Sequence, residues 1–157
     1  MFAEADPLLQ MAQTACPESP EALRTLATLL LSLAGLRFEC SRLKEALDYC
    51  LHCLEIRERT LSPLDPLLGN TLLSAGIVYM ENGLLVESLR CHLKAVKLHE
   101  AGQRDGKHDG SPTAFAYMDL AICYWKMDQL DDANEFVEKA ADLFRVTSGE
   151  LSQKYGQ

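Results

Sequence analysis

The stretch NTLLSAGIVYMENGLLVESLRCHLKAVKLHE, residues 70–100, contains two apolar segments on either side of a polar turn at 81–83. Gly76 lies in the first segment, and Ser88 and Ala95 lie seven residues apart in the second. Seven residues are about two helical turns, so Ser88 and Ala95 share one helix face. Small residues on such a face let two helix backbones approach closely, while larger apolar neighbours fill the remaining space. We therefore predict a hairpin of two helices joined by a short turn.

The same pattern recurs along the whole chain in one register. Ala5, Ala46, Ser88 and Ala133 follow one another at steps of 41, 42 and 45 residues. A fixed period of roughly 20 to 50 residues indicates a repeat architecture. Three further columns keep the same steps: Phe2, Leu43, Leu85 and Leu130; Leu9, Cys50, His92 and Val137; Ala12, Cys53, Ala95 and Ala140. A column of small residues precedes the last three units at Ala34, Gly76 and Ala121.

Helix starts support this division independently. Ser19-Pro20, Asp65-Pro66 and Ser111-Pro112 each place a capping side chain before a proline. Proline is well tolerated at the first helical position, because its missing N–H would have no partner there. We therefore predict that helices begin at these three prolines, with turns inside the units at 40–41, 81–83 and 127–129.

These columns resemble the tetratricopeptide repeat. Residues 70–100 and LEIRERTLSPLDP, 54–66, are similar to the roughly 42-residue variety found in kinesin light chains and in C-terminal arrays of large fungal and bacterial signalling proteins. Two departures are Ala121, where the family often has glycine, and Arg37, where the other two units have tyrosine. The resemblance implies an all-α, right-handed superhelical solenoid of antiparallel helix pairs.

The expected organisation is three hairpins plus one leading helix. The opening FAEADPLLQMAQTAC matches the second helix of a unit, column for column. We interpret the chain as a fragment of a longer array, with a small complete protein capped by its first helix as the open alternative. The predicted parts are 1–16, the second helix of an incomplete leading repeat; 19–60, 65–102 and 111–147, repeats 1 to 3; and 148–157, a C-terminal connector or tail.

Composition excludes several classes of function. The net charge of −8 and the scattered basic residues are unlike a nucleic-acid-binding surface. The longest apolar run, 26–36, is too short to cross a membrane, and no basic and apolar leader opens the chain. The six cysteines lie within apolar helical patterns, where cysteine behaves as a small hydrophobe. We therefore expect a cytoplasmic protein with no nucleic-acid or membrane partner.

The sequence offers little support for a metal-binding or catalytic site. Cys50 and Cys53 are one turn apart, but a structural zinc site needs four ligands and the chain has no second such pair. His92 and His99, seven apart, are too distant to chelate one ion from a regular helix. His108 is expected in a solvated loop. Phosphate-binding loops, nucleophile elbows and metalloprotease helices are absent from the sequence, so we expect no enzyme activity, metal or cofactor.

The resemblance implies that the first helices line a concave groove with an apolar floor. The lysines, asparagines and arginine that grip a chaperone tail are missing: Leu31, Gly35, Ser74, Phe115 and Asp119 hold those positions. An apolar or amphipathic segment suits the groove better, although the same side chains could instead contact neighbouring helices. The predicted partner-binding residues are Leu31, Phe38, Asn70, Leu73, Ile77, Met80, Phe115, Met118, Asp119, Ile122, Trp125 and Lys126.

The sequence thus predicts a protein–protein interaction scaffold that binds a partner peptide or helix through its concave groove. The alternative is a regulatory or sensor segment of a larger multidomain enzyme or nucleotide-switch signalling protein. Self-association through uncapped end helices stays a third possibility for the partner. A repeat fold by itself does not name the ligand.

Overall fold

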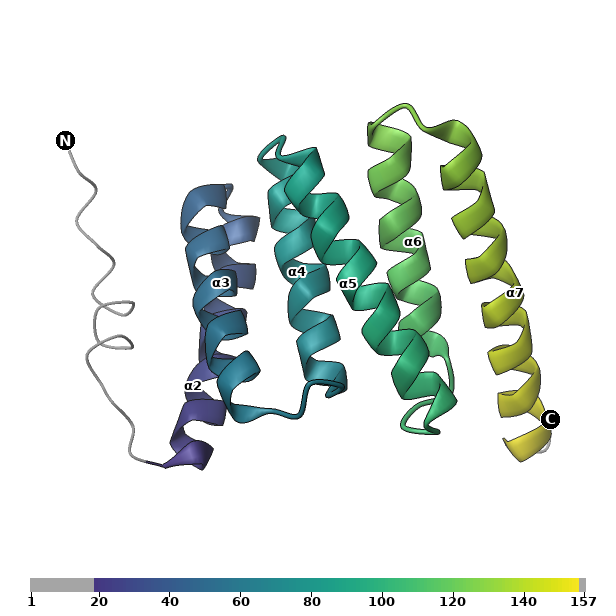
Figure 1. Cartoon of the computed structure of the whole chain (residues 1–157), viewed down its shortest axis with the longest axis horizontal. Coiled ribbons are helices and arrows are strands. Elements are labelled where there is room, and N and C mark those ends of the chain that lie inside the picture. The colour runs from purple at the N-terminus through teal and green to yellow at the C-terminus, as the bar shows by residue number, and fades with distance from the viewer. Residues whose placement is uncertain (1–18, 156–157) are drawn as a thin grey trace. The chain divides into compact units, whose positions relative to one another are not determined.

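The computed structural model describes residues 19–155, and every regular element in that range is an α-helix. The chain divides into two compact units, Met1–Leu61 and Ser62–Gln157. The predicted leading helix at 1–16 lies outside the described residues. The helices are α2 (Pro20–Glu39) and α3 (Leu43–Thr60) in the first unit, then α4 (Pro66–Glu81), α5 (Leu85–Arg104), α6 (Ser111–Lys126) and α7 (Leu130–Tyr155) in the second (Figure 1).

The helices pair as hairpins, α2 with α3, α4 with α5, and α6 with α7. Figure 1 shows the two members of the α6–α7 hairpin running side by side in opposite directions. The all-α prediction is therefore confirmed. Helix α7 continues to Tyr155, into the stretch at 148–157 that we expected to be a connector.

Two of the three predicted helix starts have the expected caps. The Ser19 hydroxyl accepts a hydrogen bond from the Ala22 N–H at 3.1 Å, and Asp65 accepts one from the Leu67 N–H at 2.9 Å. Each cap satisfies a backbone donor that the first helical turn leaves open.

The third start differs from the prediction, because Ser111 is the first residue of α6 and not its cap. Gly110 precedes the helix in the left-handed region, with φ of 95°. The Asp109 carboxylate accepts a hydrogen bond from the Ser111 N–H at 2.9 Å. Asp109 thus takes over the role expected of Ser111, and Gly110 supplies a conformation that other residues adopt only at a cost.

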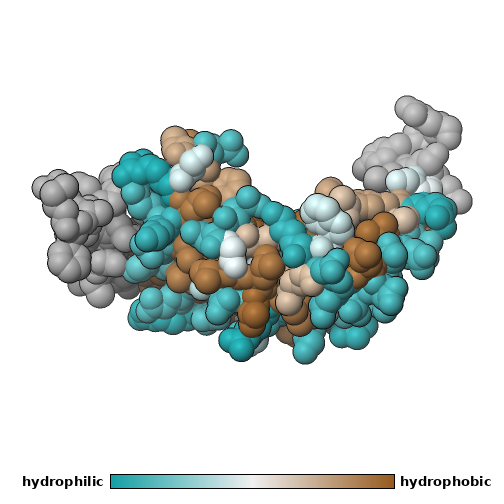
Figure 2. Space-filling view, turned by 90° about the horizontal axis from the view of Figure 1, so that it is seen from above, coloured by the Kyte–Doolittle hydropathy of each residue, from teal (hydrophilic) through white to brown (hydrophobic). Residues whose placement is uncertain are grey.

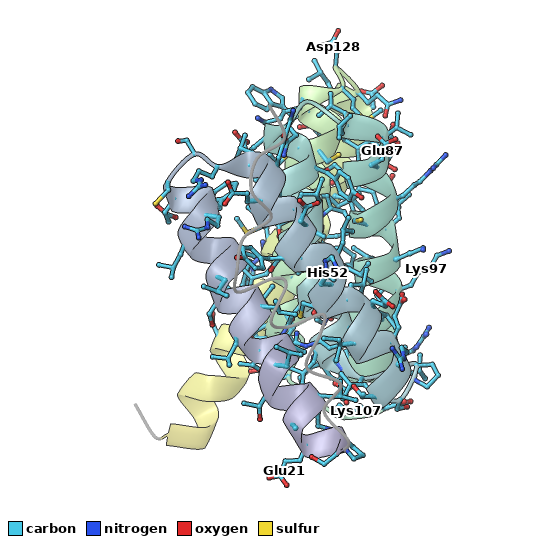
Figure 3. The ribbon with its side chains drawn as sticks, turned by 90° about the vertical axis from the view of Figure 1, so that its left-hand side faces the viewer. Glu21, His52, Glu87, Lys97, Lys107 and Asp128 are labelled. Atoms are coloured by element: carbon cyan, nitrogen blue, oxygen red, sulfur yellow. The ribbon has the colours of Figure 1, made fainter. Side chains whose placement is uncertain are left out.

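Each hairpin turn contains one residue in the left-handed region at the same repeat position. These residues are Ser41, Gly83 and Asp128, with φ of 59°, 77° and 60°. Asp128 lies at the turn after α6 and points into solvent (Figure 3). A positive φ costs a side-chain-bearing residue steric energy that glycine avoids, so the turns of the first and third hairpins carry a local strain.

The core of the second unit lies where α5, α6 and α7 meet. Val96, Ala116 and Leu120 are buried there, and α6, besides pairing with α7, packs against α5 and also approaches α4. Tyr124 stacks on Phe136 with ring centroids 5.7 Å apart. Small residues on α6 allow its close approach to the α4–α5 hairpin, and the larger residues fill the space around the contact.

Candidate apolar binding face

The groove residues predicted for the first unit are Leu31 and Phe38. Both lie on α2 and both are half-buried. On α3, Cys50 and Cys53 are buried in the core of this unit. The two cysteines therefore fill space between helices at the columns that hold small or apolar residues in the other repeats.

The four groove residues predicted on α4 are mostly covered. Asn70 is exposed, Leu73 and Ile77 are half-buried, and Met80 is only 8% exposed. Met80 is therefore not an open contact site for a partner. Leu73 packs against the cluster of Val96, Ala116 and Leu120, so α6 contributes to its burial.

The corresponding residues on α6 are open. Phe115, Met118, Ile122 and Trp125 are 56%, 42%, 40% and 62% exposed. Four large apolar side chains on successive turns of one helix form a continuous apolar row. Exposed rows of this kind on a folded protein mark interaction surfaces.

The apolar row continues onto α7 as a pocket of about 570 Å³, which we call the α6–α7 pocket. Its α6 wall consists of Met118, Ala121, Ile122 and Trp125. Phe115 stands beside it, with its ring edge-on to Phe144 at 5.1 Å. The α7 wall, which the groove prediction missed, consists of Leu130, Ala133, Asn134, Val137, Ala140, Ala141 and Phe144. Asn134 is the only polar side chain of this lining. Apolar side chains are also exposed among hydrophilic ones on the face of the molecule drawn in Figure 2.

The repeat columns could have identified the α7 wall. Leu130, Val137 and Phe144 occupy the columns of Leu85, His92 and His99 on α5. His92 and His99 are completely buried in the inner hairpin, whereas Val137 is 54% exposed. These columns therefore mark a surface on which a neighbouring helix packs. Because Val137 is exposed in the last hairpin, that surface is open there.

Two charged groups lie along the α6 side of the face. Asp119 is half-buried, and burial raises the pKa of its carboxyl to about 6. It has no hydrogen bond or ion pair with any other described residue. Lys126 is already paired, because its ammonium lies 3.1 Å from the Glu81 carboxylate on α4. Asp119 is thus the carboxylate on this helix that a cationic partner could neutralise.

The buried histidines of α5 face glycines of α4. A Cβ placed on Gly76 would lie 2.6 Å from His92 Cε1, and one on Gly69 would lie 2.6 Å from His99 Nε2. Burial lowers the pKa of each imidazole to about 4, so both are neutral at pH 7. Their ring nitrogens have no hydrogen-bond partner among the described residues. The two histidines therefore act as packing groups that fill the space left by the missing side chains of Gly76 and Gly69.

The expectation of a solvated His108 is wrong. His108 is half-buried, and its ring lies edge-on to His99 with centroids 5.8 Å apart. Its Nδ1 accepts a hydrogen bond from the Gly110 N–H at 3.3 Å. The long connector folds back on the end of α5, where removal of the ring from water is favourable. Within residues 19–155, no group of three or more histidine, cysteine or acidic side chains is placed to hold a metal ion.

Comparison with known proteins places this fold in a family. The family model described as tetratricopeptide repeat matches residues 24–101 and, in a second copy, 68–145. The chain belongs to the tetratricopeptide repeat family. Tetratricopeptide repeats generally mediate protein–protein interaction, and proteins built from them are typically non-catalytic scaffolds.

Solved structures show the same fold at low sequence identity. BtubC (BKLC) from P. vanneervenii is 18% identical with a TM-score of 0.76, over 90% of this chain and 54% of that one. The N-terminal domain of stress-induced protein-1 (STI-1) from C. elegans is 17% identical with a TM-score of 0.61, over 84% of this chain and 96% of that one. The search of curated proteins returned no sequence match. In the described part of the tetratricopeptide repeat chain, no helix is both long and apolar enough to cross a membrane.

Proposed function

We propose that this chain is a non-catalytic protein-interaction module that binds a peptide or helix of a partner protein through the apolar face of α6. The observation that carries the proposal is the row of Phe115, Met118, Ile122 and Trp125, all at least 40% exposed on one helix. Aromatic residues and methionine are enriched at the centres of protein interfaces.

The chemistry of the face supports an apolar or amphipathic partner. The positions at which other tetratricopeptide repeats grip a chaperone carboxylate hold Phe115 and Asp119 on α6. A carboxylate at this point repels a C-terminal carboxylate. The methionine and aromatic side chains adapt to different apolar groups, so they tolerate a partner that differs in detail.

Selection from a display library of helical and extended peptides tests the proposal. The full chain is immobilised, and the affinity of each selected peptide is measured by titration calorimetry. We expect Trp125→Ala and Phe115→Ala each to weaken binding about tenfold or more, because central aromatic side chains carry most of the energy of an interface.

Val146→Ala is the matched control. Val146 is 56% exposed, like Phe115, but it lies on α7, outside both the α6 row and the lining of the α6–α7 pocket. Its replacement should leave affinity unchanged, and circular dichroism should show the same helix content in all variants. A selection without binders, or binders indifferent to both aromatic replacements, would contradict the proposal.

A further inference from the structure

The outer face of the α6–α7 hairpin repeats a surface that is already occupied one repeat earlier. Four columns are buried in the inner hairpin, at Met80, His92, Ala95 and Val96. Their counterparts in the last hairpin line the α6–α7 pocket, at Trp125, Val137, Ala140 and Ala141. Helix α6 packs on the inner hairpin, and the described residues contain no corresponding helix over the last one.

The inner contact shows which kind of group fits such a face. Ala116 and Leu120 of α6 are completely buried, and they pack with Val96 of α5. An α-helix with alternating small and large apolar residues thus fills this surface, because small residues set the approach and large ones fill the hollow. The α6–α7 pocket presents the same columns, so a helix is the element that matches its shape.

The charge around the two faces differs. Three of the bordering columns are uncharged in the inner hairpin, at Ser74, Val86 and Leu93, and two are acidic, at Glu81 and Glu100. In the last hairpin the three uncharged columns hold Asp119, Asp131 and Glu138, and the two acidic columns hold Lys126 and Arg145, which are paired with Glu81 and Asp142. Each of the three carboxylates lies three or four positions from a pocket residue on its own helix, Asp119 from Ile122 and both Asp131 and Glu138 from Asn134.

None of the three carboxylates is neutralised within the described residues. Asp119, Asp131 and Glu138 have no ion pair with them, whereas Glu135 and Asp142 pair with Lys139 and Arg145 on the same helix. The α6–α7 pocket is therefore an apolar hollow whose border groups without an ion pair are the carboxylates Asp119, Asp131 and Glu138, because the bordering cations are already paired. A helix lying in it places its flanking positions next to these groups.

Charge also distinguishes between the groups that could fill the α6–α7 pocket. A second copy of this chain carries a net charge of −8. The segment at 1–18 contains Glu4, Asp6 and Glu18 and no lysine or arginine. Both are repelled by an acidic border, whereas lysine or arginine on a partner helix is attracted to it.

We propose that the α6–α7 pocket binds a cationic amphipathic α-helix of a partner protein, with an apolar stripe in the pocket and basic residues against Asp119, Asp131 and Glu138. This inference rests on the proposed interaction function and names the class of partner. It places the partner across α6 and α7, whereas the proposed function requires only the α6 row.

The probe is a synthetic peptide that carries the packing residues of α6 and lysines at its flanking positions, with leucine in place of tryptophan. A matched peptide carries glutamates at the same flanking positions. Trp125 is the single tryptophan of the chain and lines the pocket, so its emission reports occupancy directly. We expect the lysine peptide to shift this emission to shorter wavelength and to bind about tenfold or more tightly than the glutamate peptide at low salt.

Two sets of variants locate the site. Ala141 is exposed on the α7 wall, so Ala141→Glu should abolish binding of the lysine peptide while the helical circular dichroism stays unchanged. Val146→Glu adds the same charge outside the pocket and should retain binding. Exchanging both α7 border charges, Asp131→Lys with Glu138→Lys, should remove or invert the preference between the two peptides.

Several results would overturn the inference. These are equal affinity for the two peptides, an unchanged Trp125 emission on binding, binding that survives Ala141→Glu, and a homodimer in sedimentation that Ala141→Glu dissociates. The two proposals fail separately. Library binders that need Phe115 but ignore Ala141→Glu leave the interaction function standing and remove the helix site, whereas loss of both kinds of binding removes both.

Discussion

The contact between Gly76 and His92 makes a quantitative prediction about the inner hairpin. A Cβ on Gly76 would lie 2.6 Å from His92 Cε1 and 2.8 Å from its Nε2, and the ring is completely buried. Overpacking of this kind costs about 1–3 kcal/mol, while alanine gains about 1 kcal/mol over glycine within a helix. We therefore expect Gly76→Ala to lower the free energy of unfolding by up to about 2 kcal/mol.

The third repeat supplies the compensating change, because Ala121 and Val137 occupy the same two columns there. In the His92→Val background the clash is gone, so Gly76→Ala should stabilise the protein by about 1 kcal/mol through helix propensity alone. The two substitutions should therefore be coupled by about 1–3 kcal/mol, which is the cost of the overpacking alone.

Urea denaturation of the four proteins in this cycle, followed by circular dichroism, measures the coupling. A coupling below about 0.5 kcal/mol would refute the reasoning, because independent sites add to within that margin. Gly83→Ala is unsuitable as a control because its φ of 77° adds strain. Gly35→Ala is suitable, because a Cβ on Gly35 meets nothing within 4 Å and should stabilise α2 by about 1 kcal/mol in both backgrounds.

Two further predictions concern pH and turn geometry. Burial lowers the pKa of His92 and His99 from 6.5 to about 4, so the unfolded chain binds more protons between these values and stability falls as pH drops from 6.5 towards 4. The loss approaches about 3 kcal/mol for each histidine, and His92→Val should reduce the fall in the free energy of unfolding between pH 7 and pH 4 by about that amount; an unchanged fall would contradict this assignment. Asp128→Gly should stabilise the last hairpin by about 0.5–1 kcal/mol, since Asp128 has a φ of 60° that glycine adopts without strain. The opposite change at the equivalent turn, Gly83→Ala, should destabilise the protein by a similar amount, and equal thermal midpoints for the two variants would show that φ does not control these turns.

Local signals predicted the helices well because they depend on neighbouring residues. Prolines after Ser19 and Asp65 mark helix starts, since capping and the fixed φ of proline act within one turn. The predicted cap of the third helix was wrong because both Asp109 and Ser111 have side chains that can cap a helix. Asp109 and Gly110 together form the cap, and the position of a serine before a proline does not show which carboxylate reaches the open N–H.

The histidines illustrate a second limit of sequence reasoning. Their spacing indicated correctly that His92 and His99 share a helix face, but it did not indicate what that face contacts. His92 and His99 fit closely because Gly76 and Gly69 stand opposite them on α4, and these pairs join residues 16 and 30 positions apart. His108 was expected in solvent for the same reason, because its contact with His99 depends on how the connector folds back.

The sequence by itself determined the repeat register, the pairing of successive helices and the columns that face a neighbour, because all three depend on spacing along one chain. Tertiary structure alone decided which of these columns are covered. Met80 and Trp125 share one column, yet Met80 is 8% exposed and Trp125 is 62% exposed. The physical reason is that α6 packs on the inner hairpin, whereas within the described residues no helix packs on the α6–α7 pocket.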